Sequence, residues 1–179
     1  MSPLPQPSPP DALVAFVREQ HPRVVGTLTL YTGDRHRAEE LAQETFVRVC
    51  RDWDRIARMN APGAWVHRVA MNLAHSSHRR SGAERRAHGK LVARGAVVDG
   101  SSMVEPGEDP AVAAEVRRAV LALPDGERAV IALRYFADLS VFDTAAALGI
   151  PEGTVKTRTR RAIEALRTSG LLVEVSADE

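Results

Sequence analysis

The sequence lacks the features that mark several common protein classes. Cys50 is its only cysteine, which excludes an intramolecular disulfide and a cysteine-based zinc cluster. No stretch approaches the roughly 20 consecutive apolar residues that a membrane-spanning helix needs. The proline-rich start, residues 2–10, lacks the apolar core of a signal peptide. We therefore expect a flexible lead-in and a cytoplasmic protein without membrane insertion.

Aromatic residues and β-branched runs are also scarce, whereas Ala, Arg, Leu and Glu dominate the periodic stretches. This composition favours helix over sheet, and the periodicity falls into two blocks with a polar segment between them. We expect an all-α protein of two small helical domains joined by a flexible linker. The expected parts are a tail (1–10), a first domain (11–80), a polar linker (81–109), a second domain (110–170) and a C-terminal tail (171–179).

The first block contains several helical segments. A short amphipathic segment precedes Pro22, and a second apolar run, 24–30, ends at Gly33, a usual helix stop. Asp34 can cap the next helix. One face of that helix is expected to point inward, namely Ala38, Leu41, Thr45 and Val49. A different stripe is acidic and polar with one apolar member: Glu40, Gln43, Glu44 and Val47.

After a break at residues 60–63, another helix is expected to begin near Trp65 and to finish at Arg79 and Arg80. In it, one face is shared by Trp65, Val69, Asn72 and Leu73. The polar segment that follows is basic in its first half and acidic over 99–109. The acidic run either imitates nucleic acid or is simply part of a tether.

The second block contains a helix-turn-helix pattern. Ser140 and Asp143 have capping-box spacing at the start of a short helix, and Gly149 ends that helix. Pro151 suits the first turn of a second helix, where Val155 would pack against the first. The tight turn requires the two helices to cross steeply, which is the geometry of a DNA-binding motif.

The second helix of this motif has a basic face. Four residues are expected to project outward: Lys156, Thr157, Arg160 and Arg161. Such a face suits the major groove, where Arg and Lys bind guanine edges or phosphates. The plainer interpretation is an ordinary solvated face, and we favour DNA binding because the cap, the turn and the basic face occur together.

Motifs in both blocks resemble those of extracytoplasmic-function sigma factors of the sigma-70 family. In the second block these are LP at 123–124, ER at 127–128, LRYF at 133–136 and LGIPEGTVKTR at 148–158, which are similar to region 4. In the first block AEELAQETF at 38–46 is similar to region 2, and AWVHRVA at 64–70 with NLA at 72–74 resembles the stretch that faces the −10 element.

The resemblance implies a sigma factor that binds core RNA polymerase through the β′ clamp helices and the β flap and that binds promoter DNA. It also allows an anti-sigma factor as a further partner, and it implies no cofactor and no metal. The implied core-polymerase-binding residues are Glu39, Glu40, Gln43, Glu44 and Val47. The implied −10 element residues are Arg55, Asn60, Arg68, Asn72, Arg79 and Arg80. The implied −35 element residues are Glu152, Thr154, Lys156, Thr157, Arg158, Arg160 and Arg161.

The sequence departs from the family at several positions. Thr144 and Thr159 stand where the family usually has apolar residues, which predicts a looser core in the second domain. His75 and His78 share a helix face, but without a third ligand we expect solvated or phosphate-contacting side chains. Nothing resembles an active site, so we predict a non-enzyme. The rivals are a stand-alone helix-turn-helix regulator, which leaves 38–49 without a role, and a sigma-like interaction protein that no longer melts promoters.

Overall fold

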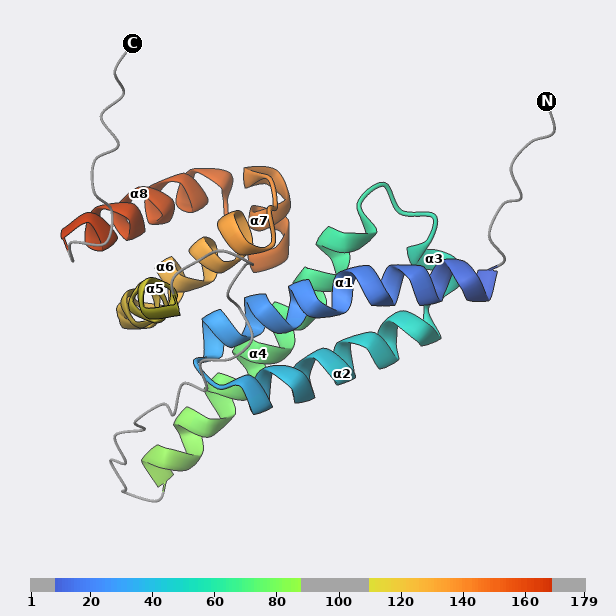
Figure 1. The fold of residues 1–179 in the computed structure, drawn as a ribbon, viewed down its shortest axis with the longest axis horizontal. Helices are drawn as coiled ribbons and strands as arrows, with labels where there is room; N and C mark the ends of the chain where they lie inside the picture. The colour runs from blue at the N-terminus through green and yellow to red at the C-terminus, as the bar shows by residue number, and fades with distance from the viewer. Residues whose placement is uncertain (1–8, 88–109, 169–179) are drawn as a thin grey trace, which may run out of the picture.

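The computed structural model describes residues 9–87 and 110–168, and within these ranges the chain is helical with no strand, as the composition predicts (Figure 1). The expected lead-in over 1–8, most of the expected linker (88–109) and the C-terminal tail lie outside the described residues. The first domain comprises α1 (Pro9–Thr32), α2 (Arg35–Arg51), α3 (Trp53–Ile56) and α4 (Pro62–Ala87). The second comprises α5 (Pro110–Ala122), α6 (Asp125–Ile131), η1 (Ala132–Phe136), α7 (Val141–Leu148) and α8 (Glu152–Thr168).

The prediction of two segments separated at Pro22 is wrong, because α1 continues through this proline. Proline removes one backbone donor from a helix interior and crowds the preceding turn, which costs about 3 kcal/mol. Packing on both sides of Pro22 offsets this cost. Phe16 contacts the core before the proline, and Val24 and Leu28 are completely buried after it.

The end of α1 and the start of α2 form as the local sequence predicts. Gly33 ends α1 with a φ of 73°, a conformation that costs glycine little. The Asp34 side chain then accepts a hydrogen bond of 3.0 Å from the backbone N–H of Arg37, which confirms the predicted cap. The predicted inward face of α2 is also confirmed, since Ala38, Leu41, Thr45 and Val49 are all buried.

Helix α4 differs from expectation in its length and its buried face. It continues to Ala87, beyond Arg80 and into the segment predicted to be linker. Trp65, Val69 and Leu73 are only partly buried, and Asn72 is exposed. The fully buried stripe lies beside them and contains Val66, His67, Ala70, Met71 and Ala74. This stripe combines small and medium side chains, which allow α4 to pack closely against α1 and α2.

The second domain contains the expected helix-turn-helix, formed by α7 and α8 (Figure 1). Ser140 caps α7 by accepting from the backbone N–H of Asp143 at 3.0 Å, and its hydroxyl donates to the Asp143 carboxylate at 2.7 Å. Gly149 ends α7 with a φ of 65°. Val155 is completely buried and forms a small cluster with Val130 and Ala145, which fixes how α8 crosses α7.

The two domains pack against each other. Helix α7 lies against α4, while α5, α6 and η1 lie against α1 (Figure 1). Buried residues of both domains form one continuous apolar core. The sequence predicts a flexible connection between domains, and it contains no periodicity that identifies this contact.

Candidate functional site

The outward face of α8 carries cations and hydroxyls, as predicted. Lys156, Thr157, Arg160 and Arg161 are all exposed. The Thr157 hydroxyl donates to the carbonyl of Gly153 at 2.9 Å, which fixes its rotamer on this face. The helix therefore presents basic and hydroxyl-bearing side chains that suit phosphates and base edges.

Two other predicted −35 residues stand at the start of α8. Glu152 is exposed, and Thr154 is half-buried. The carboxylate lies in the first turn of the helix, where negative charge is favoured by the helix dipole.

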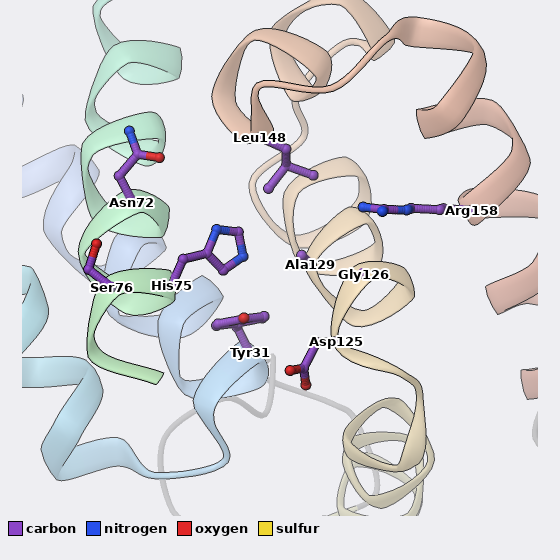
Figure 2. Close-up of a pocket in the computed structure, with 9 residues that line it drawn as sticks. All are labelled: Tyr31, Asn72, His75, Ser76, Asp125, Gly126, Ala129, Leu148 and Arg158. Atoms are coloured by element: carbon purple, nitrogen blue, oxygen red, sulfur yellow. The ribbon is translucent and has the colours of Figure 1, made fainter. Parts of the chain in front are cut away.

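Arg158 is placed differently from the other predicted −35 residues. It is half-buried, and its guanidinium lies against Gly126 of α6 rather than in open solvent (Figure 2). A Cβ atom at position 126 would lie 2.9 Å from Arg158 Cζ, so the absent side chain makes room for the guanidinium. The helical spacing of α8 alone does not reveal this position.

The polar stripe of α2 lies on the surface of the first domain. Glu40, Gln43, Glu44 and Val47 are exposed, and Val47 has a relative exposure of 68%. Glu39, at the edge of the stripe, is half-buried. Single exposed apolar side chains are normal on protein surfaces, so the exposure of Val47 does not by itself identify a binding surface.

Each carboxylate of this stripe already has an arginine on the same helix. Three ion pairs join the side chains: Arg35 to Glu39 at 2.9 Å, Arg37 to Glu40 at 2.6 Å and Arg48 to Glu44 at 2.8 Å. Exposed pairs of this kind contribute only about 0–1 kcal/mol, so a partner can displace them at low cost. The stripe is consequently less acidic than its glutamates alone indicate.

The predicted −10 residues lie along α3, the following turn and α4. Arg55 stacks over the Trp65 ring with its Cζ atom 5.6 Å from the ring centroid, and Trp65 packs partly against the core. Arg68 and Asn72 are exposed one turn apart on α4, and Asn60 is exposed before it. Arg79 and Arg80 fall within α4, but their side chains lie outside the described residues.

A pocket of about 480 Å³ lies between the two domains (Figure 2). The first domain contributes Tyr31, Asn72, His75 and Ser76. The second contributes Asp125, Gly126, Ala129, Leu148 and Arg158. The structure thus brings together a predicted −10 residue, Asn72, and a predicted −35 residue, Arg158, at one cavity.

Tyr31 lies where α1 of the first domain meets α6 of the second. The guanidinium carbon of Arg128 lies 5.7 Å from the centroid of its ring, and the His75 ring meets it edge-on at 5.3 Å. Burial raises the pKa of Tyr31 to about 12, with a further contribution from the Asp125 carboxylate that Arg128 opposes. His75, predicted to be solvated or to contact phosphate, is half-buried against Tyr31 and also lines the pocket. The His78 side chain lies outside the described residues.

The sequence gives no sign that His67 is buried, whereas it places Thr144 at a usually apolar position. His67 has 2% exposure, and its Nδ1 atom has no hydrogen-bond partner. Burial lowers the pKa of His67 to about 4, and the charge of Arg23 lowers it further. Thr144 is completely buried, and its hydroxyl has no hydrogen-bond partner among the residues that the structure describes. Its occurrence at a usually apolar position was the available signal, whereas Thr159 instead bonds the Val155 carbonyl at 2.9 Å.

The described part of the chain contains no helix long and apolar enough to cross a membrane. Within the same residues, no group of three or more His, Cys, Asp or Glu side chains is arranged to hold a metal ion.

Comparison with known proteins gives matches in both domains. The family model described as Sigma-70 region 2 matches residues 16–84, and that described as Sigma-70, region 4 matches residues 119–168. The ECF RNA polymerase sigma factor SigW of Bacillus subtilis is 34% identical over 142 residues, which cover 75% of this chain and 76% of SigW. SigL of Mycobacterium tuberculosis (strain H37Rv) is 33% identical over 163 residues, covering 87% of this chain and 88% of SigL.

A solved structure has a similar fold. It is that of the sigma factor RpoE in complex with the anti-sigma factor NepR from Bartonella quintana, with a TM-score of 0.73 and 21% identity. The match covers 88% of this chain and 96% of RpoE. The family models and the sequence relatives together show that this chain belongs to the sigma-70 family and is an RNA polymerase sigma factor of the extracytoplasmic-function type.

Proposed function

We propose that this sigma factor divides its work between two exposed helix faces, one in each domain. The α2 stripe binds core polymerase, and α8 binds the −35 element. The observation that supports this division best is the order of the matches, region 2 followed by region 4, each with an exposed polar helix face. A stand-alone regulator needs α8 but provides no role for the α2 stripe.

Core binding by α2 depends on the exchange of ion-pair partners. Glu40 and Glu44 are held by Arg37 and Arg48, and a basic partner helix would displace these arginines. Val47 then supplies apolar contact area beside the charges. This mode predicts binding that weakens with salt, since exposed charges are screened.

Single charge reversals test this surface. We expect Glu40→Lys and Glu44→Lys to lower the affinity for purified core polymerase at least about tenfold, since like charges placed opposite each other cost several kcal/mol. Glu19→Lys is the matched control, because Glu19 is exposed in the same domain but lies outside the stripe. Equal binding by all three variants would remove α2 from the interface. A fall in core binding with unchanged affinity for DNA would separate a sigma factor from a stand-alone regulator.

We propose that Lys156, Thr157, Arg160 and Arg161 bind the −35 element in the major groove, with Glu152 and Thr154 at the start of the same helix. Arg158, half-buried against Gly126, belongs to the same proposed set. We expect Lys156→Glu and Arg160→Glu to weaken binding of duplex −35 DNA. Removal of one phosphate-binding cation should lower the slope of log affinity against log salt by about 1. Arg167→Glu, exposed in the last turn of α8, is the matched control.

We propose that Arg55, Asn60, Arg68 and Asn72 face the −10 element, together with Arg79 and Arg80. The cation of Arg55 is already positioned by the Trp65 ring, which reduces the entropy cost when it binds a phosphate. Fluorescence of 2-aminopurine in the −10 element reports melting. Arg68→Ala should slow melting without affecting core binding, whereas equal impairment of both would indicate a structural role.

The remaining assignments complete this proposal. The protein acts as a non-enzymatic initiation factor in the cytoplasm and takes an anti-sigma protein as a partner. The similarly folded RpoE was solved in complex with the anti-sigma factor NepR. Run-off transcription with core polymerase on pooled genomic promoters tests the proposed function as a whole. Discrete starts that require the protein support it, and tight core binding without new starts would favour the sigma-like interaction protein.

A further inference from the structure

The pocket of about 480 Å³ has polar side chains on several of its walls. Figure 2 shows the His75 ring and the Arg158 guanidinium directed into it from opposite sides, with Leu148 pointing in from a third side. Its volume falls within the range of roughly 300–1,000 Å³ that is typical of small-molecule sites. Cavities that stay empty are apolar, whereas polar cavities hold water or a ligand. The chemistry of the walls therefore indicates what this pocket can bind.

Arg158 supplies the pocket with a cation that is not neutralised within the described part of the chain. Its half-buried guanidinium lies against Gly126, and it forms no ion pair with a described residue. The Asp125 carboxylate, by contrast, pairs with Arg128. A guanidinium binds phosphate through two parallel hydrogen bonds, because its planar array of N–H groups matches the oxygens of the anion. The phosphate group of a small molecule is therefore the anion that suits this side of the pocket.

The other walls suit a flat ring with hydrogen-bonding edges. Ala129 and Leu148 contribute apolar surface, as in most small-molecule sites. Asn72 can both donate and accept hydrogen bonds, and Ser76 adds a hydroxyl one turn later on α4. A phosphate, a flat ring and a polar edge occur together in a nucleoside monophosphate.

We propose that the pocket binds a nucleoside monophosphate, with its phosphate on Arg158 and its base between the apolar wall and Asn72. Binding of this ligand depends on the pocket alone, whereas its consequence rests on the proposed function. Arg158 belongs to the proposed −35 residues, and its guanidinium cannot bind the ligand phosphate and DNA at the same time. A nucleotide in the pocket therefore competes with −35 DNA for this side chain, which makes promoter binding sensitive to a small metabolite.

Isothermal titration calorimetry of the full chain tests the site with AMP, GMP, CMP and UMP. Each is titrated to about 1 mM, at the upper end of physiological substrate levels. We expect saturable binding of at least one nucleotide and much weaker binding of inorganic phosphate. Arg158→Gln should lower the nucleotide affinity at least about tenfold, because hydrogen bonds between charged groups are the strong ones. Arg161→Gln is the matched control, since Arg161 is exposed on the same helix and lies outside the pocket.

A second variant tests the wall that the first domain contributes. Ser76→Glu places a negative charge on exposed helix surface at the pocket and should lower the affinity at least about tenfold by repelling the phosphate. Gln43→Glu adds the same charge to the exposed face of α2 and should bind like the parent chain. In amide NMR spectra, the Asn72 side-chain amide and the Gly126 backbone N–H should shift on binding. Circular dichroism establishes that each variant is folded, and the two pocket substitutions lie in different domains, so unfolding of one leaves the other to decide.

The bound nucleotide should also weaken binding of duplex −35 DNA, with an apparent Kd that rises with nucleotide concentration. No saturable binding of any of the four nucleotides would overturn the proposal and leave a water-filled pocket. Equal weakening by Arg158→Gln and Arg161→Gln would also overturn it, because the ligand would then bind the basic face of α8. Equal affinity for inorganic phosphate would overturn the role of the base, and unchanged DNA affinity would overturn the competition. Absence of −35 DNA binding by the parent chain counts instead against the proposed function, while calorimetry still decides the ligand site.

Discussion

Acidification should destabilise this protein through one buried histidine. His67 of α4 has 2% exposure, and its Nδ1 atom has no partner in the core between α1 and α4. Its pKa is lowered from 6.5 to about 4 in the folded chain, by burial and by the charge of Arg23. The neutral form is therefore the folded form, and unfolding below pH 6.5 takes up a proton that the folded state does not bind.

The sign and the size of this change in folding stability follow from the two pKa values of His67, 6.5 in the unfolded chain and about 4 in the folded chain. Stability is unaffected well above pH 6.5, falls as the pH drops from 6.5 to about 4, and levels off below that. One pKa unit corresponds to about 1.4 kcal/mol, so the complete loss from His67 is about 3 kcal/mol. At pH 5 the loss is about 2 kcal/mol, a large part of the stability of a small protein.

Urea unfolding at pH 7.5 and pH 5, followed by circular dichroism, measures this loss. The comparison is with His67→Leu, which fills a similar volume with no titratable group. We expect the parent chain to lose about 2 kcal/mol more than the variant between the two pH values. The other histidines are present in both proteins, so their contributions cancel. An identical pH dependence of parent and variant would refute the assignment to His67.

Three further substitutions test the packing of the helix-turn-helix. Thr144→Val keeps the shape of a buried side chain but removes an unpartnered hydroxyl, so the free energy of unfolding in urea should rise by about 1 kcal/mol or more; a fall would contradict the buried, unpaired hydroxyl. Gly149→Ala places a Cβ at a φ of 65° and should lower the free energy of unfolding by about 1 kcal/mol, whereas no change would mean that the turn relaxes. Val155→Ala leaves a cavity beside Val130 and Ala145, and a decrease of about 2 kcal/mol is expected in the same assay.

Features that depend on a few neighbouring residues could be predicted from the sequence. The cap at Asp34, the left-handed turn at Gly149 and the outward face of α8 each follow from local spacing, and the structure contains all three. Capping and turn conformations are set by interactions within one turn, so no knowledge of the tertiary fold is needed.

Features that depend on distant residues could not be predicted in this way. Continuation of α1 through Pro22 depends on core contacts made by residues on both sides of it. The inward turn of Arg158 depends on the absent side chain at Gly126, more than 30 positions earlier in the chain. His67 lies within the AWVHRVA motif. Histidine occurs on both buried and exposed faces of helices, so its neighbours in the sequence do not indicate that it is buried.

The contact between domains and the helix-turn-helix share one short element. Helix α7 has only eight residues, and isolated helices shorter than about 12 residues are marginal in water. Helix α7 is supported by α4 of the first domain and by α8 of its own domain. Within the second domain, the cluster of Val130, Ala145 and Val155 holds α7 in place against α8. A helix this short therefore depends on the packing of Val155 for its position in the helix-turn-helix, and the orphan hydroxyl of Thr144 weakens the same element.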